Sequence, residues 1–183
     1  MKPLRALISA SLFASALAGA AVLKTDPAKS SVAAVFKQMG VPVEASFKSF
    51  TAQIDYDAAR PEAAKAAVDI NTASMDLGDA EYNREVAKKE WFNTAQFPKA
   101  SFVSTAIKAA GPGKLNVTGK LTIKGRSANV SFPLAVKTDA GKQVFEGQLP
   151  IRRLAFNIGE GEWKDTSMVA DEVVIKFRVT AGQ

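Results

Sequence analysis

The segment at 115–134, LNVTGKLTIKGRSANVSFPL, constrains the fold more than any other part of the chain. Small or apolar residues occupy every second position from Val117 to Ile123, and the alternation resumes after a break at Gly125. A two-residue period predicts strands with one buried and one exposed face, because successive side chains of a strand point to opposite sides. Glycine can adopt the positive φ of a tight turn between them. We therefore expect a long β-hairpin whose apolar face other strands must cover.

The rest of the chain supplies six further strands with the same alternation. We expect them at 30–38, 43–56 and 63–71, from 99 to the turn at 111–113, from the turn at 138–141 through 151, and at 169–180. Together with the two hairpin arms they make eight. Long alternating strands in an even number, joined by short turns, predict an all-β fold, an eight-stranded antiparallel barrel.

Two irregular segments interrupt this pattern. Within 43–56 the apolar phase changes between Phe47 and Phe50, and a change of one residue predicts a β-bulge. Strong helix-forming residues follow Asp79, a good N-cap, so we expect one short helical insertion at about 80–88. The aromatic run at 91–98 is expected to line or close one end of the barrel.

The first twenty residues have the pattern of a signal peptide. Lys2 and Arg5 precede an apolar run at 6–17, and Ala18-Gly19-Ala20 resembles a small-x-small cleavage site. No cysteine follows the run, so this pattern does not predict a lipoprotein anchor. We therefore expect residues 1–20 to direct export to the periplasm and residues 21–183 to form one soluble domain.

Composition excludes several kinds of chemistry. The chain has no cysteine and no histidine, the residues on which most zinc sites and nucleophile–histidine pairs depend. We expect no catalytic residue, no metal site and no cofactor. Without Lys2 and Arg5 there remain 22 basic and 18 acidic residues, a net charge of +4 that is spread along the chain. This distribution lacks the basic stripe of a nucleic-acid-binding protein.

The order of motifs resembles the YceI-like family over nearly the whole of 21–183. Its most specific pieces are FPKASFVST at 97–105 and GKLTIKG at 119–125. The resemblance implies an exported, lipocalin-like barrel that binds polyisoprenoids or other long amphiphiles. Many family members carry an Arg-Asp-x-His-Leu-like run where this chain has EYNREV at 81–86, so no head-group or metal role of that histidine carries over.

Side chains on the inner faces of the strands and in the aromatic segments are the candidates for lining a ligand cavity. They are Phe36, Phe47, Val68, Ile70, Trp91, Phe92, Phe102, Ser104, Val117, Leu121, Ile123, Val130, Phe132, Phe145, Leu149, Phe156, Trp163, Ile175 and Phe177. Small residues between the aromatic ones would leave room for a chain. The same alternation would also fit a core filled by its own side chains.

Four cations are candidates for binding an anionic head group such as a pyrophosphate, and a solvated charged face is the alternative for each. They are Arg84 and Lys88 on the expected helix, and Arg152 and Arg153 near Trp163.

Three functions remain open on the sequence. The first is a periplasmic carrier of a long-chain lipid such as a polyisoprenoid, a quinone-like lipid or a fatty-acid derivative. The second is a structural or interaction barrel with a filled core, as a homodimer or with an envelope or membrane protein partner. The third, an enzyme, would need carboxylates, a bound metal or a Ser–Lys pair such as Ser127 with Lys124, and no oxyanion site accompanies that pair.

Overall fold

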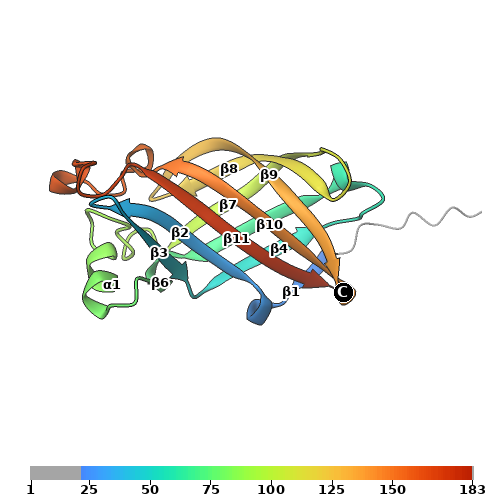
Figure 1. Cartoon of the computed structure of the whole chain (residues 1–183), viewed down its shortest axis with the longest axis horizontal. Helices are drawn as coiled ribbons and strands as arrows, with labels where there is room; N and C mark the ends of the chain where they lie inside the picture. The colour runs from blue at the N-terminus through green and yellow to red at the C-terminus, as the bar shows by residue number, and fades with distance from the viewer. Residues whose placement is uncertain (1–21, 183) are drawn as a thin grey trace, which may run out of the picture.

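A computed structural model describes residues 22–182, so the expected signal peptide lies outside the described residues. The described chain forms eleven strands, one α-helix and five short 3-10 helices (Figure 1). The strands are β1 (Val22–Thr25), β2 (Ser31–Gln38), β3 (Val41–Phe47), β4 (Phe50–Asp55), β5 (Lys65–Asn71), β6 (Met75–Asp76), β7 (Lys99–Ala109), β8 (Lys114–Ile123), β9 (Arg126–Asp139), β10 (Lys142–Arg152) and β11 (Glu172–Gly182). The helices are α1 (Ala80–Val86), η1 (Pro27–Lys29), η2 (Pro61–Ala63), η3 (Thr72–Ser74), η4 (Arg153–Phe156) and η5 (Gly161–Lys164).

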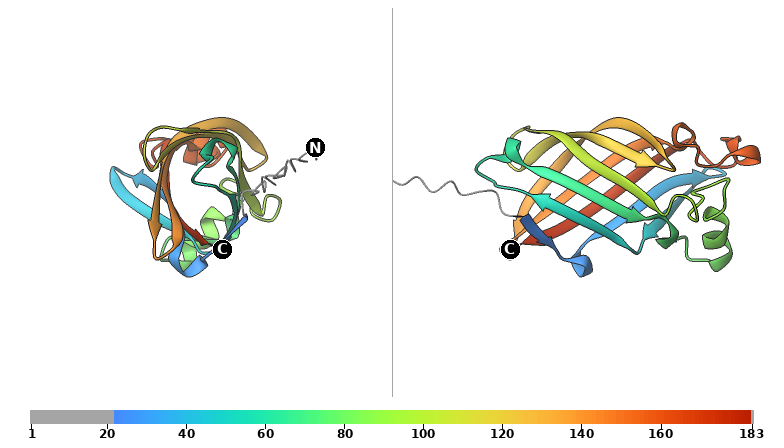
Figure 2. Two further views of the ribbon diagram at one scale, coloured as in Figure 1. Left: turned by 90° about the vertical axis from the view of Figure 1, so that its right-hand side faces the viewer. Right: turned by 180° about the vertical axis from the view of Figure 1, so that it is seen from behind.

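Eight of the strands close into an antiparallel barrel. Each strand of the ring β1-β4-β5-β7-β8-β9-β10-β11 is hydrogen-bonded to the next, and β11 returns to β1 through the pair Lys24 and Gly182. The end-on view in Figure 2 shows this ring. Closure leaves no free sheet edge in the ring. The prediction of an eight-stranded antiparallel barrel with one helix is confirmed.

Three strands of the ring, β1, β4 and β5, each have a neighbouring strand in the chain that lies at one end of the barrel: β2, β3 and β6, respectively. β2 follows β1 after η1 and pairs with β11, β3 precedes β4 and pairs with β2, and β6 follows β5 after η3 and pairs with β3. These segments add a wall of strands at this end, in the order β11-β2-β3-β6, whereas the other end is the one that the β1–β11 pair closes.

The predicted bulge within 43–56 is a full interruption between β3 and β4. The two linking residues leave the ladder, and the backbone N–H groups of Lys48 and Ser49 donate to the carbonyl and hydroxyl oxygens of Ser74. The register shift of the sheet lies in β7 instead, where Ser104 pairs with Gly119 and Ala106 with Thr118, so that Thr105 is the extra residue. A bulge there increases the local bend of the wall.

A roof covers the end of the barrel that β2, β3 and β6 extend. It consists of α1, the segment 87–98 and the loop 153–169, which lie together in Figure 1. Asp79 caps α1, since its Oδ1 accepts from the N–H groups of Glu81 and Tyr82. The helix ends at Val86, earlier than predicted, because the chain turns back and the N–H of Phe92 donates to the Val86 carbonyl.

Aromatic rings fill the middle of the barrel. The ring of Phe132 packs against those of Phe102 and Phe177, with centroids 5.5 and 5.4 Å apart. Phe102 and Phe177 lie directly over Gly119 and Gly147, where any Cβ would overlap the rings. The space beside these two glycines, expected to admit a ligand, is therefore occupied by the protein itself.

Candidate functional site

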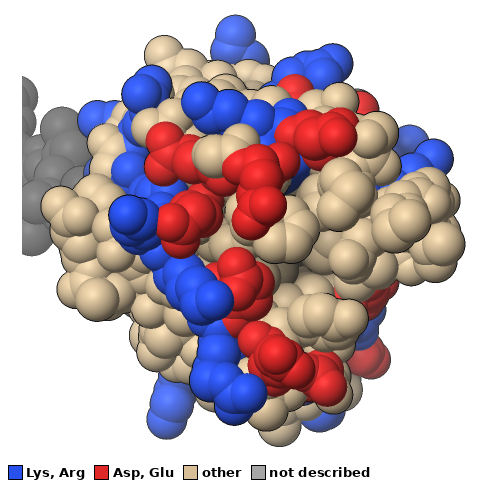
Figure 3. Space-filling model, turned by 90° about the vertical axis from the view of Figure 1, so that its left-hand side faces the viewer, with Lys and Arg blue, Asp and Glu red and all other residues tan. Residues whose placement is uncertain are grey.

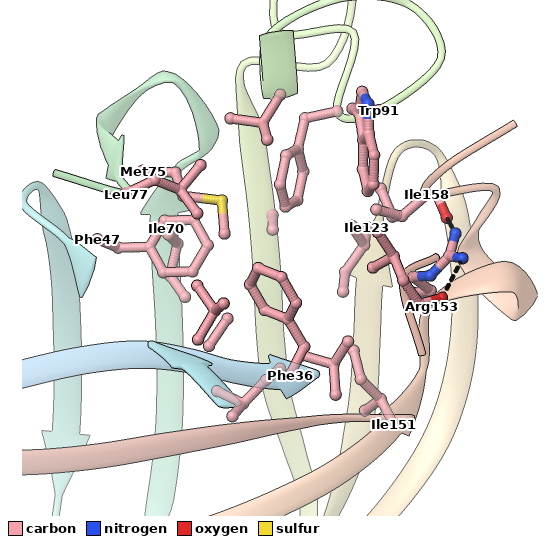
Figure 4. Close-up of a pocket in the computed structure, with 18 of the residues that line it drawn as sticks. Phe36, Phe47, Ile70, Met75, Leu77, Trp91, Ile123, Ile151, Arg153 and Ile158 are labelled. Atoms are coloured by element: carbon pink, nitrogen blue, oxygen red, sulfur yellow. Dashed lines mark hydrogen bonds between the residues drawn. The ribbon is translucent and has the colours of Figure 1, made fainter. Parts of the chain in front are cut away.

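An apolar cavity of about 570 Å³ lies under the roof. Its walls come from the inner faces of the strands and from the roof, and Figure 4 shows Phe36, Phe47, Ile70, Trp91 and Ile123 among the side chains around it. The volume falls within the range of about 300–1,000 Å³ typical of small-molecule sites. The predicted alternative of a completely filled core is wrong for this half of the barrel.

A narrower cavity of about 120 Å³ occupies the other half. The two cavities share five wall residues, which form a waist between them: Val68, Ile70, Phe102, Leu121 and Ile175. Beyond the waist the space narrows because Phe132 and Phe177 enter it, together with Phe145, whose ring packs edge-to-face on Tyr56 at 5.3 Å. The barrel is thus wide and hollow near the roof, and side chains nearly fill it at the other end, where β1 pairs with β11.

The structure brings most of the predicted lining residues to these two cavities. Around the wide cavity are Phe36, Phe47, Val68, Ile70, Trp91, Phe92, Phe102, Leu121, Ile123, Trp163 and Ile175. Around the narrow one are Val68, Ile70, Phe102, Val117, Leu121, Phe132, Phe145, Leu149, Ile175 and Phe177.

Three predicted lining residues lie outside the cavity walls. The hydroxyl of Ser104 accepts a hydrogen bond of 2.9 Å from the N–H of Ala66, so it supports the sheet. Phe156 is buried within η4, 3% exposed. Val130 pairs with Gly119 across the β8–β9 ladder and packs on the core without bordering either cavity.

Sequence reasoning missed several residues of the wide cavity. They are Ala34, Gln38, Val43, Met75, Leu77, Glu81, Tyr82, Glu85, Val86, Ala100, Ser101, Ile151, Ile158, Val169 and Val173, while Arg153, a head-group candidate, also borders this cavity. Strand alternation was sufficient to find Ala34, Val43 and Ile151. The β3–β6 pairing brings Met75 and Leu77 to the cavity wall, and no local sequence pattern predicts that pairing.

Arg153 serves the structure rather than a head group, which corrects one prediction. It is 2% exposed, and all five of its N–H donors are used by backbone carbonyls. The acceptors are the carbonyls of Ile158, Gly159, Trp163, Val169 and Ala170, at 2.7–3.3 Å. Its guanidinium also lies 5.8 Å from the centre of the Trp91 ring, and desolvation lowers its pKa. Arg153 therefore holds the roof loop together, as Figure 4 shows in part.

The other three candidate cations lie on the outer surface and not in the cavity wall. Lys88 pairs with Glu85, and that hydrogen bond raises the pKa of the Lys88 ammonium. Arg152 pairs with Asp171 at 3.3 Å, and Arg84 is exposed on α1. None of the three borders the wide cavity.

The polar groups that do border the cavity mark its mouth. Gln38, Glu81 and Tyr82 belong to the wall and are exposed, so the cavity reaches the surface between α1 and the end of β2. Two carboxylates, Glu81 and Glu85, face this opening from α1. Figure 3, which views this end, shows acidic and basic side chains in a belt across the surface with a broad uncharged area beside it. The mouth itself carries amide, phenol and carboxylate groups.

A buried lysine ties the central hairpin to the roof. Lys124, in the β8–β9 turn, donates to the carbonyls of Lys89 and Asn157 at 2.6 and 2.8 Å, and to the carboxylate of Glu160 at 2.9 Å. The hydrogen bond from Lys124 holds the pKa of the Glu160 carboxyl below its ordinary range. Lys124 is therefore occupied by structural contacts and does not face Ser127 as a catalytic base would. Instead Ser127 shares a hydrogen bond of 2.8 Å with Thr122.

Within 22–182, no group of three or more acidic, histidine or cysteine side chains is arranged to hold a metal ion. In the same range no helix is long and apolar enough to cross a membrane.

The fold and the cavity agree with what comparison with known proteins finds. A family model described as the YceI-like domain matches residues 23–181. The chain belongs to the YceI-like family. The resemblance predicted from 97–105 and 119–125 is thereby confirmed.

Several relatives of this YceI-like protein span most of its length. A UPF0312 protein of Shewanella oneidensis is 38% identical over 148 residues, which cover 79% of this chain and 74% of that protein. The crystal structure of Burkholderia cenocepacia BcnA is 54% identical with a TM-score of 0.84, and the match covers 86% of this chain and 99% of that one. A polyisoprenoid binding domain from Saccharophagus degradans, implicated in plant cell wall breakdown, has a TM-score of 0.70 at 17% identity, covering 90% and 98%. At that identity the last match shows a common fold.

Proposed function

We propose that this protein binds a long-chain amphiphilic lipid, such as a polyisoprenoid, a quinone-like lipid or a fatty-acid derivative, and carries it through the periplasm. The observation that supports this most is the apolar cavity of about 570 Å³ with a polar mouth. Each methylene moved from water into such a cavity gains about 0.8 kcal/mol, so a long chain binds without polar contacts along its length. Family membership and the polyisoprenoid binding named for the Saccharophagus degradans domain support the same ligand class.

The head group of this lipid is uncharged in our proposal. Glu81 and Glu85 belong to the cavity wall, and the carboxylate of Glu85 is paired with Lys88. Arg84, Lys88 and Arg152 are not part of that wall, and carbonyls use all five donors of Arg153. Carboxylates repel a pyrophosphate and accept hydrogen bonds from a hydroxyl. A prenol or a phenol therefore fits the mouth better than a phosphorylated lipid. This replaces the anionic head group expected from the cations in the sequence.

The role proposed is binding and not catalysis. The chain lacks histidine and cysteine, and the wide cavity is lined mainly by aliphatic and aromatic side chains. The export pattern at 1–20 supports the periplasm as the place of action.

Mass spectrometry of lipids extracted from natively exported protein tests this function, together with titration by a fluorescent prenol. We expect a co-purifying lipid and saturable prenol binding. An Ala34→Phe variant places a ring in the wide cavity and should weaken prenol binding about tenfold or more. Ala106→Phe adds the same ring on the exposed face of β7 and should leave binding unchanged.

Two results would count against the proposal. One is the absence of both co-purifying lipid and prenol uptake. The other is equal prenol affinity of the Ala34→Phe and Ala106→Phe variants while circular dichroism shows both folded, since the chain would then lie outside the wide cavity.

A further inference from the structure

Large apolar side chains that stay exposed gather around the mouth. Of the six such side chains among the described residues, Met39, Val41, Tyr82 and Met168 lie here, with exposed fractions of 72%, 62%, 58% and 45%, whereas Val22 and Val103 lie elsewhere. Isolated exposed apolar residues are ordinary, but a cluster of them marks an interaction surface.

Three members of this cluster come from two neighbouring segments. Met39 is at the tip of the β2–β3 hairpin, and its N–H donates to the carbonyl of Met168 at 2.8 Å. Val41 pairs with Gln38 across the same hairpin, and Gln38 in turn bridges to Val169. Met39, Val41 and Met168 therefore belong to one edge of the mouth, and Tyr82 on α1 borders the same opening.

The cluster continues the cavity wall to the outside. Val43 lies in the wall, and Val41, two residues earlier on β3, faces the same side of the sheet and extends that wall past the mouth. Val169 also lies in the wall, and Met168, which precedes it in the chain, is exposed. Apolar side chains of β3 and of the segment 168–169 thus extend from the cavity wall toward the hairpin tip, beside the polar side chain of Gln38.

We propose that this rim, defined as Met39, Val41, Tyr82 and Met168, inserts into the surface of a lipid bilayer, so that a lipid moves between bilayer and cavity without crossing water. The inference rests on the proposed lipid-binding function. A protein partner seated on the rim would close the mouth, whereas a bilayer offers an apolar phase at the place where the wall ends. The charges beside Tyr82 are of both signs, since Glu85 is paired with Lys88 and Glu81 and Arg84 lie on the same helix, so insertion depends on apolar contact.

Vesicle flotation tests the rim directly, with vesicles of zwitterionic phosphatidylcholine. We expect the protein to float with the vesicles and to do so equally at low and high salt, since no charge pairing is involved. The triple substitution Met39→Asn, Val41→Thr and Met168→Gln should reduce the bound fraction about tenfold or more, because partitioning follows the apolar area inserted. Val103→Thr, on the exposed outer face of β7, is the matched control and should float normally.

Transfer kinetics separate the rim from the cavity. A fluorescent prenol delivered from a cyclodextrin complex should bind the unmodified protein and the triple variant with equal affinity, since none of the three residues borders the cavity. Delivered in vesicles, it should enter the triple variant about tenfold more slowly, in line with its reduced partitioning. Equal transfer rates, or flotation that high salt abolishes, would overturn the inference.

Two further outcomes are informative. If the unmodified protein sediments as a dimer that the triple substitution dissociates, with no change in flotation, the rim is a self-association surface and the bilayer inference is wrong. If the protein takes up no prenol from either source, the proposed function fails, while flotation still decides the inference about the rim.

Discussion

Single residues show why charge in a sequence is a poor guide to a ligand's head group. Arg152 and Arg153 are adjacent and were equal candidates, yet one is exposed on β10 and the other is fixed by five carbonyls inside the roof. Those carbonyls belong to 158–170, and nothing in the local sequence indicates that the loop turns back over Arg153.

Arg153→Lys should lower the free energy of unfolding by about 2–4 kcal/mol, because lysine has three donors and leaves buried carbonyls unpaired. Urea denaturation measures this change. Arg152→Lys is the neighbouring control and should change stability by less than about 1 kcal/mol, as expected for an exposed ion pair. Equal effects of the two substitutions would contradict the structural role of Arg153.

At the scale of one side chain, the sequence predicts the strand interiors well. In the roof it identifies the cavity residues Trp91, Phe92 and Trp163 but not the structural role of Arg153. Alternation located Phe36, Phe102 and Phe177 because β-strands direct every second side chain inward. Phe156 was a candidate without any strand pattern and lies buried in a 3-10 helix, and the hydroxyl of Ser104, predicted to contact a ligand, supports the neighbouring strand.

Among the elements, three two-residue hairpin turns share one geometry. The β2–β3, β8–β9 and β9–β10 turns each have a non-glycine residue at φ near +50° followed by a glycine at φ of +73° to +81°. This is the pattern of a type I′ turn, which suits the twist of the strands. The β8–β9 turn differs because it lies against Phe97 of the roof. A Cβ on Gly125 would lie only 2.9 Å from the Cε1 atom of the Phe97 ring.

Gly125→Ala should therefore cost more stability than Gly141→Ala in the β9–β10 turn. Both substitutions place alanine at positive φ, which costs roughly 1–2 kcal/mol. Only the first also displaces Phe97, so we expect a further loss of about 1 kcal/mol there. Thermal unfolding of the two variants makes the comparison, and equal losses would show that Phe97 moves aside freely.

The limits of prediction at this scale lie in the strand breaks. The phase change after Phe47 correctly marked a discontinuity, but it could not distinguish a bulge from a division into β3 and β4. The division depends on Ser74, 25 residues after Ser49. Its carbonyl and hydroxyl oxygens accept the N–H groups of Lys48 and Ser49, which have left the strand ladder. The bulge in β7 leaves no comparable signal, because Thr105 fits either face.

The whole molecule divides into a hollow half and a filled half, and this division sets the length of chain that can enter. Closure of the ring was predictable from eight alternating strands, but the volume inside was not. Large and small residues alternate in both halves, and only the packing of Phe102 over Gly119 and Phe177 over Gly147 shows where the space ends.

Phe132 stands just beyond the waist, at the centre of the aromatic layer that begins the narrow half, so its size should limit the ligand. Phe132→Leu opens the narrow half, and prenols longer than those the protein normally accepts should then gain affinity. The measurement is prenol affinity against chain length, in which the length that gives maximal affinity should increase. The substitution should cost about 1–2 kcal/mol of stability, because the loss of ring volume is only partly compensated.

Phe156→Leu provides the matched control, since Phe156 is also buried, 3% exposed against 8% for Phe132, but borders neither cavity. It should lose a comparable amount of stability and keep the original dependence on chain length. If both variants keep that dependence, the aromatic layer does not limit the chain. The lipid would then be held entirely under the roof, and its length would be set by how far it extends through the mouth.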